Sequence, residues 1–248
     1  MPRTEKAPLD KLLVDRGLAP TLAEAQALIM TGSVIVDDHA TDKPKSLIPL
    51  SAQIRLKRSP KKYASRGGTK LEKPLDIFNI SVTDKTVLDV GASTGGFTDC
   101  LLQRGARTVY AIDVGYGQLA WKLREDARVK VLERANICSL SRQEIPVPAD
   151  LAVIDVSFTS LKKIWPPVSA LVKPGGELLS LVKPQFEAKK EDVEAGGVVR
   201  NIKTYQKVIQ AMVETARALS LHVVGIMESP IRGQKGNREF FLYAIKKS

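Results

Sequence analysis

The chain has 248 residues, of which 44% are hydrophobic, and this length allows one large domain or two unequal ones. Its 38 Lys and Arg residues outnumber 27 Asp and Glu residues, and the resulting net charge of +11 suits a polyanionic partner such as nucleic acid. Two isolated cysteines, two histidines and no apolar run of about 20 residues argue against a disulfide scaffold, a metal site and a membrane span. With no apolar leader at the N-terminus either, we expect a cytoplasmic protein.

The first part of the chain predicts a small α+β domain over residues 1–58. Residues 8–18 predict a short helix, and the Thr-x-x-Glu capping box at 21–24 predicts that a second helix begins there. Two short apolar runs, 34–36 and 53–56, would form a small hairpin. So few elements make a marginal core, and the domain would gain stability from a partner surface.

Residues 59–68 are rich in Pro, Lys and Gly and interrupt the periodicity, so we place a basic linker there. From 55 to 73 the chain carries eight basic residues and one acidic residue. Such a run is either a solvated face or a segment that contacts nucleic acid. The residues predicted to contact RNA are Arg16, Arg55, Lys57, Arg58, Lys61, Lys62 and Arg66.

After the linker, apolar strands alternate with helices, which predicts a mostly parallel sheet covered on both faces. The last two strands have no helix between them, which predicts a terminal antiparallel hairpin. The expected strands are 86–90, 108–114, 129–132, 150–156, 177–182, 221–228 and 239–246. One expected helix begins at residue 97, and two more cover 161–172 and 202–219.

A glycine-rich loop, DVGASTGGF at residues 89–97, directly follows the first of these strands. Ligands bind beyond the carboxyl ends of strands in open α/β sheets. Gly91 fits a tight turn, and Gly95 and Gly96 would let a ligand approach the backbone. Asp113 comes 22 residues after Gly91, at the end of the next strand, where an acid typically binds ribose hydroxyls.

The cofactor class follows from how this loop departs from the dinucleotide fingerprint. A pyrophosphate site has the regular GxGxxG, whereas Ser93 stands here in place of the middle glycine. The loop favours S-adenosylmethionine, with a dinucleotide or a purely structural turn as the alternatives.

Four charged residues fall where they could meet at the same edge of the sheet. Asp155 and Lys183 end strands, Glu239 begins the last strand, and Lys70 lies at the edge of the second domain. Each alone could be structural, but together they fit methyl transfer to a ribose 2′-hydroxyl, a weak acid that needs a base and nearby cations. Base methylation is disfavoured because the turn DVSF lacks prolines and neither cysteine has an evident base partner.

Five segments, YASRGGTKL, DVGASTGGF, DVSF, LVKPQFE and GGVVRN, occur in this order and resemble the TlyA (hemolysin A) family. Over residues 69–248 the chain also resembles the FtsJ (RrmJ) ribose 2′-O-methyltransferases. The first part, to about residue 57, resembles the αL RNA-binding motif, with Asp37-Asp38-His39 in place of its usual Asn-Gly turn. The resemblance covers essentially the whole chain.

The resemblance implies a Rossmann-like methyltransferase sheet and a function. The FtsJ-type catalytic tetrad would fall on Lys70, Asp155, Lys183 and Glu239, with Lys183 as the base. The substrate would be cytidine 2′-hydroxyls of ribosomal RNA in ribosomal subunits, modified by a monomer that needs neither metal nor membrane. Contacts to S-adenosylmethionine would come from Asp89, Gly91, Ser93, Thr94, Gly95, Gly96, Phe97, Asp113, Asn136 and Asp155.

Two other functions remain open from the sequence. The name hemolysin suggests a membrane-active toxin, although no amphipathic helix with a bulky apolar face supports it. An RNA-binding protein with an inactive methyltransferase domain is the second alternative. The segment 187–200 is either a lid or a connection.

Overall fold

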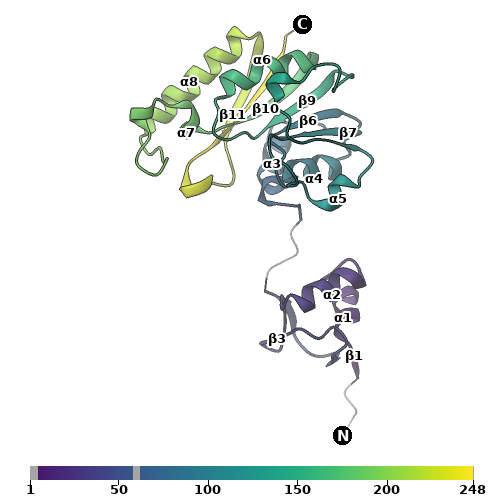
Figure 1. The fold of residues 1–248 in the computed structure, drawn as a ribbon. Coiled ribbons are helices and arrows are strands. Elements are labelled where there is room, and N and C mark those ends of the chain that lie inside the picture. The colour runs from purple at the N-terminus through teal and green to yellow at the C-terminus, as the bar shows by residue number, and fades with distance from the viewer. Residues whose placement is uncertain (1–4, 58–61, 248) are drawn as a thin grey trace. The chain divides into compact units, whose positions relative to one another are not determined.

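The computed structural model describes residues 5–57 and 62–247. The chain divides into two compact units, Met1–Lys61 and Lys62–Ser248. Figure 1 shows both as ribbons, and each is described here by itself. Two of the residues predicted to contact RNA, Arg58 and Lys61, lie outside the described residues.

The first unit holds two helices and two small antiparallel sheets. One sheet has the order β3-β2-β5, and the other pairs β1 with β4. All four expected elements are present, and the two expected strands, β2 and β5, pair antiparallel, whereas β1, β3 and β4 were not predicted. The elements are β1 (Lys6–Pro8), α1 (Leu9–Asp15), α2 (Leu22–Met30), β2 (Val34–Val36), β3 (His39–Thr41), β4 (Leu47–Pro49) and β5 (Ile54–Leu56).

Local chemistry accounts for the ends of these elements. Thr21 caps α2, and its hydroxyl oxygen accepts a hydrogen bond from Glu24 N at 3.2 Å, as the capping box predicts. Between β2 and β3, Asp37 and Asp38 both have positive φ, 44° and 68°. A two-residue hairpin turn needs positive φ at both positions, so the aspartates replace the Asn-Gly pair without changing the turn.

The second unit is a seven-stranded sheet with the order β11-β12-β10-β9-β6-β7-β8. The five strands from β10 to β8 are parallel, and β12 lies antiparallel between β10 and β11. The predicted fold class and the terminal antiparallel hairpin are confirmed. The strands are β6 (Thr86–Val90), β7 (Thr108–Ile112), β8 (Val129–Leu132), β9 (Ala149–Ile154), β10 (Val172–Val182), β11 (Leu221–Glu228) and β12 (Phe240–Lys246).

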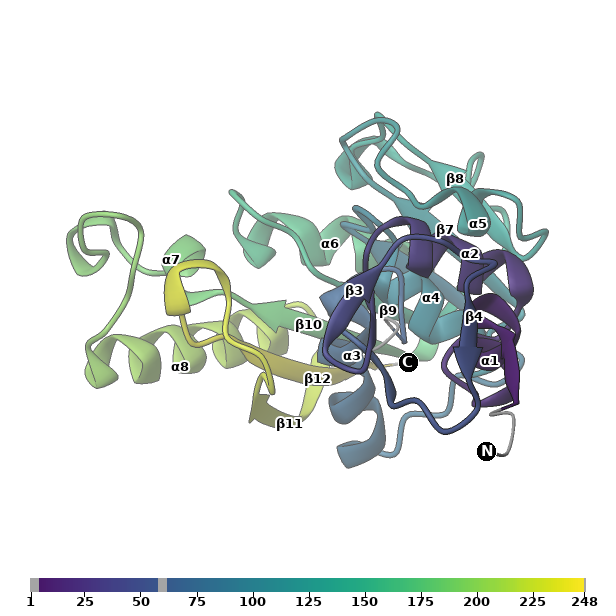
Figure 2. The same cartoon turned by 90° about the horizontal axis from the view of Figure 1, so that it is seen from below.

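Helices cover both faces of this sheet (Figures 1 and 2). One face packs against α3 and α4, and the other against α6 and α8. Because alternate residues of a strand point to opposite faces, Val87 joins the first core and Leu88 the second. The helices are α3 (Arg66–Ile77), α4 (Gly96–Gln103), α5 (Trp121–Arg124), α6 (Leu161–Leu171), α7 (Pro184–Glu187) and α8 (Ile202–Ala218).

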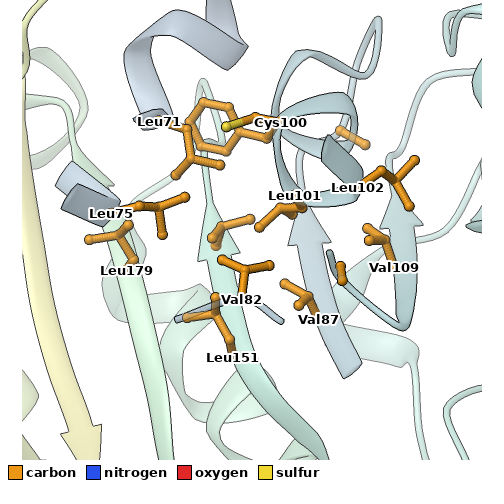
Figure 3. Close-up of a cluster of buried hydrophobic side chains, with 14 of the residues drawn as sticks. Leu71, Leu75, Val82, Val87, Cys100, Leu101, Leu102, Val109, Leu151 and Leu179 are labelled. Atoms are coloured by element: carbon orange, nitrogen blue, oxygen red, sulfur yellow. The ribbon is translucent and has the colours of Figure 1, made fainter. Parts of the chain in front are cut away.

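Helix α3 was not predicted from the sequence, and it begins inside the expected linker. Ser65 caps it by accepting a hydrogen bond from Gly67 N at 3.2 Å. The Gly-Gly step and Pro74 within the helix obscured its periodicity. Its apolar side, including Leu71 and Leu75, packs on α4 and the sheet (Figure 3), which places Lys70 at the carboxyl edge of the strands.

Candidate active site

Two adjoining cavities open at the carboxyl ends of β6, β7, β9 and β10. The larger has a volume of about 710 Å³ and the smaller about 620 Å³. They share a wall formed by Gly91, Ser93, Asp155, Ser157 and Phe158. A reactant bound in one cavity therefore meets a reactant bound in the other at this wall.

The glycine loop turns sharply between strands that are packed against each other. Gly91 has φ +90°, and a Cβ on it would lie 2.4 Å from the carbonyl oxygen of Asp155. Ser93 has φ +48°, a left-handed conformation in which glycine is the usual residue. The loop thus keeps the backbone path of a glycine fingerprint while placing a hydroxyl at its tip.

The double glycine has a packing reason that the sequence does not show. A Cβ on Gly95 would lie 2.2 Å from Leu123 Cδ1, and a Cβ on Gly96 would lie 2.2 Å from Ser65 Oγ. These glycines therefore leave room for neighbouring protein atoms. At Gly96 these atoms belong to the start of α3, where Gly68 N would lie 2.9 Å from the added Cβ.

The smaller cavity has the groups that an adenosine needs. The Asp113 carboxylate accepts hydrogen bonds from Ser93 N at 2.8 Å and from Gly115 N at 2.7 Å. These bonds fix the carboxylate at the end of β7, where its remaining lone pairs can accept ribose hydroxyls. Asn136 also lines this cavity, among the apolar side chains of Ile112, Val114 and Ile137. Exposed Cys138 also lines this smaller cavity, whereas Cys100 is buried in α4.

The predicted cofactor residues divide into two groups. Gly91, Ser93, Thr94, Asp113, Asn136 and Asp155 line the cavities. The other four line neither of the two cavities described here; they are Asp89, Gly95, Gly96 and Phe97.

Asp89 is fully buried at the end of β6. Thr98 Oγ1 donates to its Oδ2 at 2.6 Å, while its Oδ1 accepts no hydrogen bond from the described residues. Burial, together with the negative charge of Asp155, raises the pKa of Asp89 to about 7. Between the ordinary aspartate pKa of 3.8 and about 7, the folded protein therefore holds a proton that the unfolded chain releases.

This proton makes the stability of the second unit fall as the pH rises from about 4 to about 7. Asp89→Asn should remove the effect, so the variant should gain stability over the wild type across this range, by at least about 1 kcal/mol by pH 8. Denaturant unfolding followed by tryptophan fluorescence measures it, because Trp121 and Trp165 both lie in this unit. Exposed Asp76, whose pKa is lowered by Arg104, supplies the control: Asp76→Asn should show no such gain between pH 5 and 8.

The larger cavity brings the four charged residues together. Lys70 Nζ donates to Glu239 Oε2 at 2.8 Å, and the Glu239 side chain is only 3% exposed. Lys183 Nζ lies 2.6 Å from Asp155 Oδ1, although this approach lacks hydrogen-bond geometry. All four side chains line this cavity.

The contacts of the two lysines differ. Lys70 donates a charge-assisted hydrogen bond to the buried Glu239 carboxylate. Lys183 Nζ instead donates its hydrogen bond to a neutral hydroxyl, Ser157 Oγ, at 2.8 Å. A hydroxyl can accept from an ammonium or from a neutral amine, so this partner is compatible with both forms of Lys183.

Several residues of this cavity were not predicted from the sequence. Ser157 and Phe158 belong to the DVSF turn, and the sequence predicts no role for either of them. Phe158 is 89% exposed with φ +62°, and its ring centroid lies 5.2 Å from that of Phe186. Gln185 Oε1 is buried and accepts no hydrogen bond within the described residues, so it offers an acceptor to a ligand.

The segment 187–200 contributes a wall of the larger cavity through Gly196 and Gly197. Asn237 holds it in place: its Oδ1 accepts from Val199 N at 3.0 Å and its Nδ2 donates to Gly197 O at 2.9 Å. Two segments that are distant in the sequence thus form one wall beside Glu239.

Among the predicted RNA contacts of the first unit, two have partners within the protein. Arg16 donates to Ala52 O at 2.8 Å and to Leu50 O at 2.6 Å, which braces the turn before β5. Arg55 pairs with Asp38 at 2.8 Å, although both side chains are largely exposed.

The remaining predicted RNA contacts lie at or near the surface. Lys57 is exposed, Lys62 pairs with Glu72, and Arg66 is exposed at the border of the larger cavity. Arg232 and Lys235, which were not predicted, line the same cavity. Its border is therefore positively charged.

Across 5–57 and 62–247, no group of three or more His, Cys, Asp or Glu side chains is arranged to hold a metal ion. No helix within these ranges is long and apolar enough to cross a membrane.

Comparison with known proteins places these cavities in context. Residues 63–246 match the family described as FtsJ-like methyltransferase. The chain is 46% identical over 247 residues to YqxC of Bacillus subtilis, provisionally named an rRNA methyltransferase, and covers 86% of that protein with 97% of itself. It is 42% identical over 239 residues to the 16S/23S rRNA (cytidine-2′-O)-methyltransferase TlyA of Mycobacterium tuberculosis, covering 89% of that protein with 96% of itself. A solved structure from Streptococcus thermophilus, provisionally named a hemolysin, is 40% identical with a TM-score of 0.75, and the match covers 99% of this chain and 90% of that one.

Proposed function

The chain belongs to the FtsJ-like methyltransferase family, and from this premise we propose that it methylates ribose 2′-hydroxyls of cytidine in ribosomal RNA, with S-adenosylmethionine as methyl donor. The hemolysin name and the methyltransferase name belong to the same family, because proteins of both names match this chain over nearly its whole length. The observation that carries the proposal is the meeting of Lys70, Asp155, Lys183 and Glu239 in one cavity beside a second cavity suited to adenosine.

The residues of the smaller cavity fit S-adenosylmethionine. Asp113 offers a fixed carboxylate for the ribose hydroxyls, and Ile112 and Ile137 offer apolar surface for the adenine. Gly91 lets the backbone at Asp155 approach closely at the shared wall, because a Cβ on it would lie 2.4 Å from Asp155 O. When bound, this cofactor supplies an electrophilic methyl group on a sulfonium.

The protein's own residues would bind and deprotonate the acceptor. Lys183, whose hydrogen-bond partner is neutral, is placed to accept the proton of the 2′-hydroxyl as its amine. Lys70, hydrogen bonded to Glu239, would stabilise the negative charge that develops on the oxygen. Asp155 balances the positive charge that Lys183 gains.

The shared wall and the border of the larger cavity suit a nucleotide. Phe158 exposes an aromatic face on which a base can stack. Arg66, Arg232 and Lys235 surround the cavity with positive charge that can bind phosphates. We propose that the protein acts as a monomer and, since ribosomal RNA is the substrate, in the cytoplasm.

The test is methyl transfer from labelled S-adenosylmethionine to ribosomal subunits, followed by alkaline hydrolysis of the RNA. A 2′-O-methyl group blocks cleavage at the next phosphodiester, so the label should appear in dinucleotides that begin with methylated cytidine. Label in mononucleotides would indicate base methylation and refute the proposal, as would the absence of any transfer, which favours an inactive RNA-binding protein. Leakage from liposomes would favour the toxin.

The first unit is proposed to bind RNA, and its small net charge limits how much it contributes to the electrostatic part of the affinity. Residues 1–57 hold eight Lys and Arg against seven Asp and Glu, so nearly all of the net charge of +11 belongs to residues 58–248. Deleting 1–57 should weaken RNA binding and reduce the slope of log K against log salt by about 2, for three lost phosphate contacts at ~0.7–0.9 each. Binding titrations at several salt concentrations measure the slope. An unchanged slope would place the RNA surface elsewhere.

A further inference from the structure

We propose that Ser157 is a positioning residue that aims the amine of Lys183 at the acceptor hydroxyl. The inference rests on the proposed function and adds a residue that lies outside the four charged side chains. Within residues 5–57 and 62–247, Lys183 Nζ donates a single hydrogen bond, and Ser157 Oγ accepts it at 2.8 Å.

A lysine amine that acts as a base has a directional requirement. In its neutral form it carries two N–H bonds and one lone pair in tetrahedral directions, and the lone pair must point at the proton to be removed. The side chain can rotate about its last carbon–nitrogen bond, so its position alone does not aim the lone pair. A directional partner is needed to fix that rotation.

Asp155 does not supply this direction. Its Oδ1 is close to Lys183 Nζ, at 2.6 Å, but the approach lacks hydrogen-bond geometry. Attraction between charges depends on distance and not on the N–H angle. Asp155 therefore balances the positive charge that Lys183 gains in the reaction, while the Ser157 hydroxyl orients the nitrogen beforehand by accepting one N–H.

The place of Ser157 in the molecule supports this role. It lies in the shared wall of the two cavities, three residues after the end of β9 at Ile154, and its side chain is exposed there. Its oxygen is not needed to complete the core, since the residue is exposed. In the reaction, the acceptor O–H bond breaks, and the proton forms a new N–H bond at the lone pair that Ser157 has oriented.

The test compares Ser157→Ala and Ser157→Thr in the full-length protein, with ribosomal subunits as substrate. Ser157→Ala should lower the single-turnover methylation rate by about 10²-fold, the cost of misplacing a reacting group, while the affinities for S-adenosylmethionine and RNA change by less than about threefold. Ser157→Thr keeps the hydroxyl, and its extra methyl has room at an exposed position, so it should retain a rate within about threefold of the wild type.

The pH dependence separates orientation from an effect on protonation. If Ser157 aims the lone pair, the loss in Ser157→Ala should persist up to about pH 9.5; a loss that disappears at high pH would overturn the inference. So would a parallel fall in cofactor affinity, an unchanged rate, or equal losses in the alanine and threonine variants. A wild-type protein that transfers no methyl group to RNA would instead refute the proposed function, and this inference with it.

Discussion

Lys183→Met is expected to abolish methyl transfer while leaving the cofactor bound. The rate should fall by about 10²–10⁴-fold, the usual contribution of a positioned base, because methionine has no lone pair of comparable basicity for the 2′-proton. Methionine fills nearly the same space as lysine, so the two cavities should keep their shape. Asp113 and the Gly91 turn are unchanged in the variant, and the affinity for S-adenosylmethionine should stay within about threefold.

The measurement is single-turnover methylation of ribosomal subunits together with calorimetric titration of the cofactor. Lys130→Met is the matched control, since Lys130 lies on β8 and lines neither described cavity. It should behave like the wild type. If Lys183→Met retained substantial activity, another group would be the base. Lys70 donates a hydrogen bond to the buried Glu239 carboxylate, so it would be a poor replacement.

Gly91→Ala is expected to disrupt both cavities through a single methyl group. The added Cβ would lie 2.4 Å from Asp155 O, a contact that requires the ends of β6 and β9 to move apart. The backbone at φ +90° adds an unfavourable conformation of roughly 1–3 kcal/mol. Because Asp155 and Ser157 follow β9 directly, we expect cofactor affinity to fall by at least about 30-fold and methylation to fall further.

Gly175→Ala separates the clash from the backbone strain. Gly175 has φ +70°, but a Cβ there would meet nothing within 4 Å. Gly175→Ala should lose the roughly 1–3 kcal/mol of unfolding free energy that the positive φ alone costs, which thermal denaturation measures. It should bind the cofactor normally. Equal cofactor affinities for the alanine variants of Gly91 and Gly175 would show that the close contact at Gly91 is not what shapes the site.

Much of the fold could be predicted because its signals are local. The capping box at Thr21 depends on residues three apart, and the alternation of Val87 and Leu88 between two cores reflects the two-residue period of a strand. Elements with weak local signals were missed. Helix α3 is interrupted by glycines and a proline, and its stability comes from packing on α4 and the sheet, which no short window of sequence contains.

The glycine loop shows what a motif leaves open. From the sequence, Gly95 and Gly96 predict a ligand against the backbone, and the structure adds that a Cβ on them would meet protein atoms of Leu123 and Ser65. The motif specified small residues correctly but not what occupies the space beside them. In the same way, the DVSF turn was read as lacking prolines, although its Ser157 is the hydrogen-bond partner of Lys183.

The sequence by itself determined the residue types and the ends of strands at which they stand, because burial periodicity and turn chemistry are properties of neighbouring residues. It thereby specified a parallel sheet, a cofactor loop and four charged residues at one edge. The tertiary structure alone decided which of these meet. Lys70 reaches Glu239 across 169 positions of the chain because α3 packs beside the sheet and β12 inserts between β10 and β11. The different hydrogen-bond partners of the two lysines, the Glu239 carboxylate for Lys70 and the Ser157 hydroxyl beside Asp155 for Lys183, arise from that packing, since contacts between distant segments form only when the chain is folded.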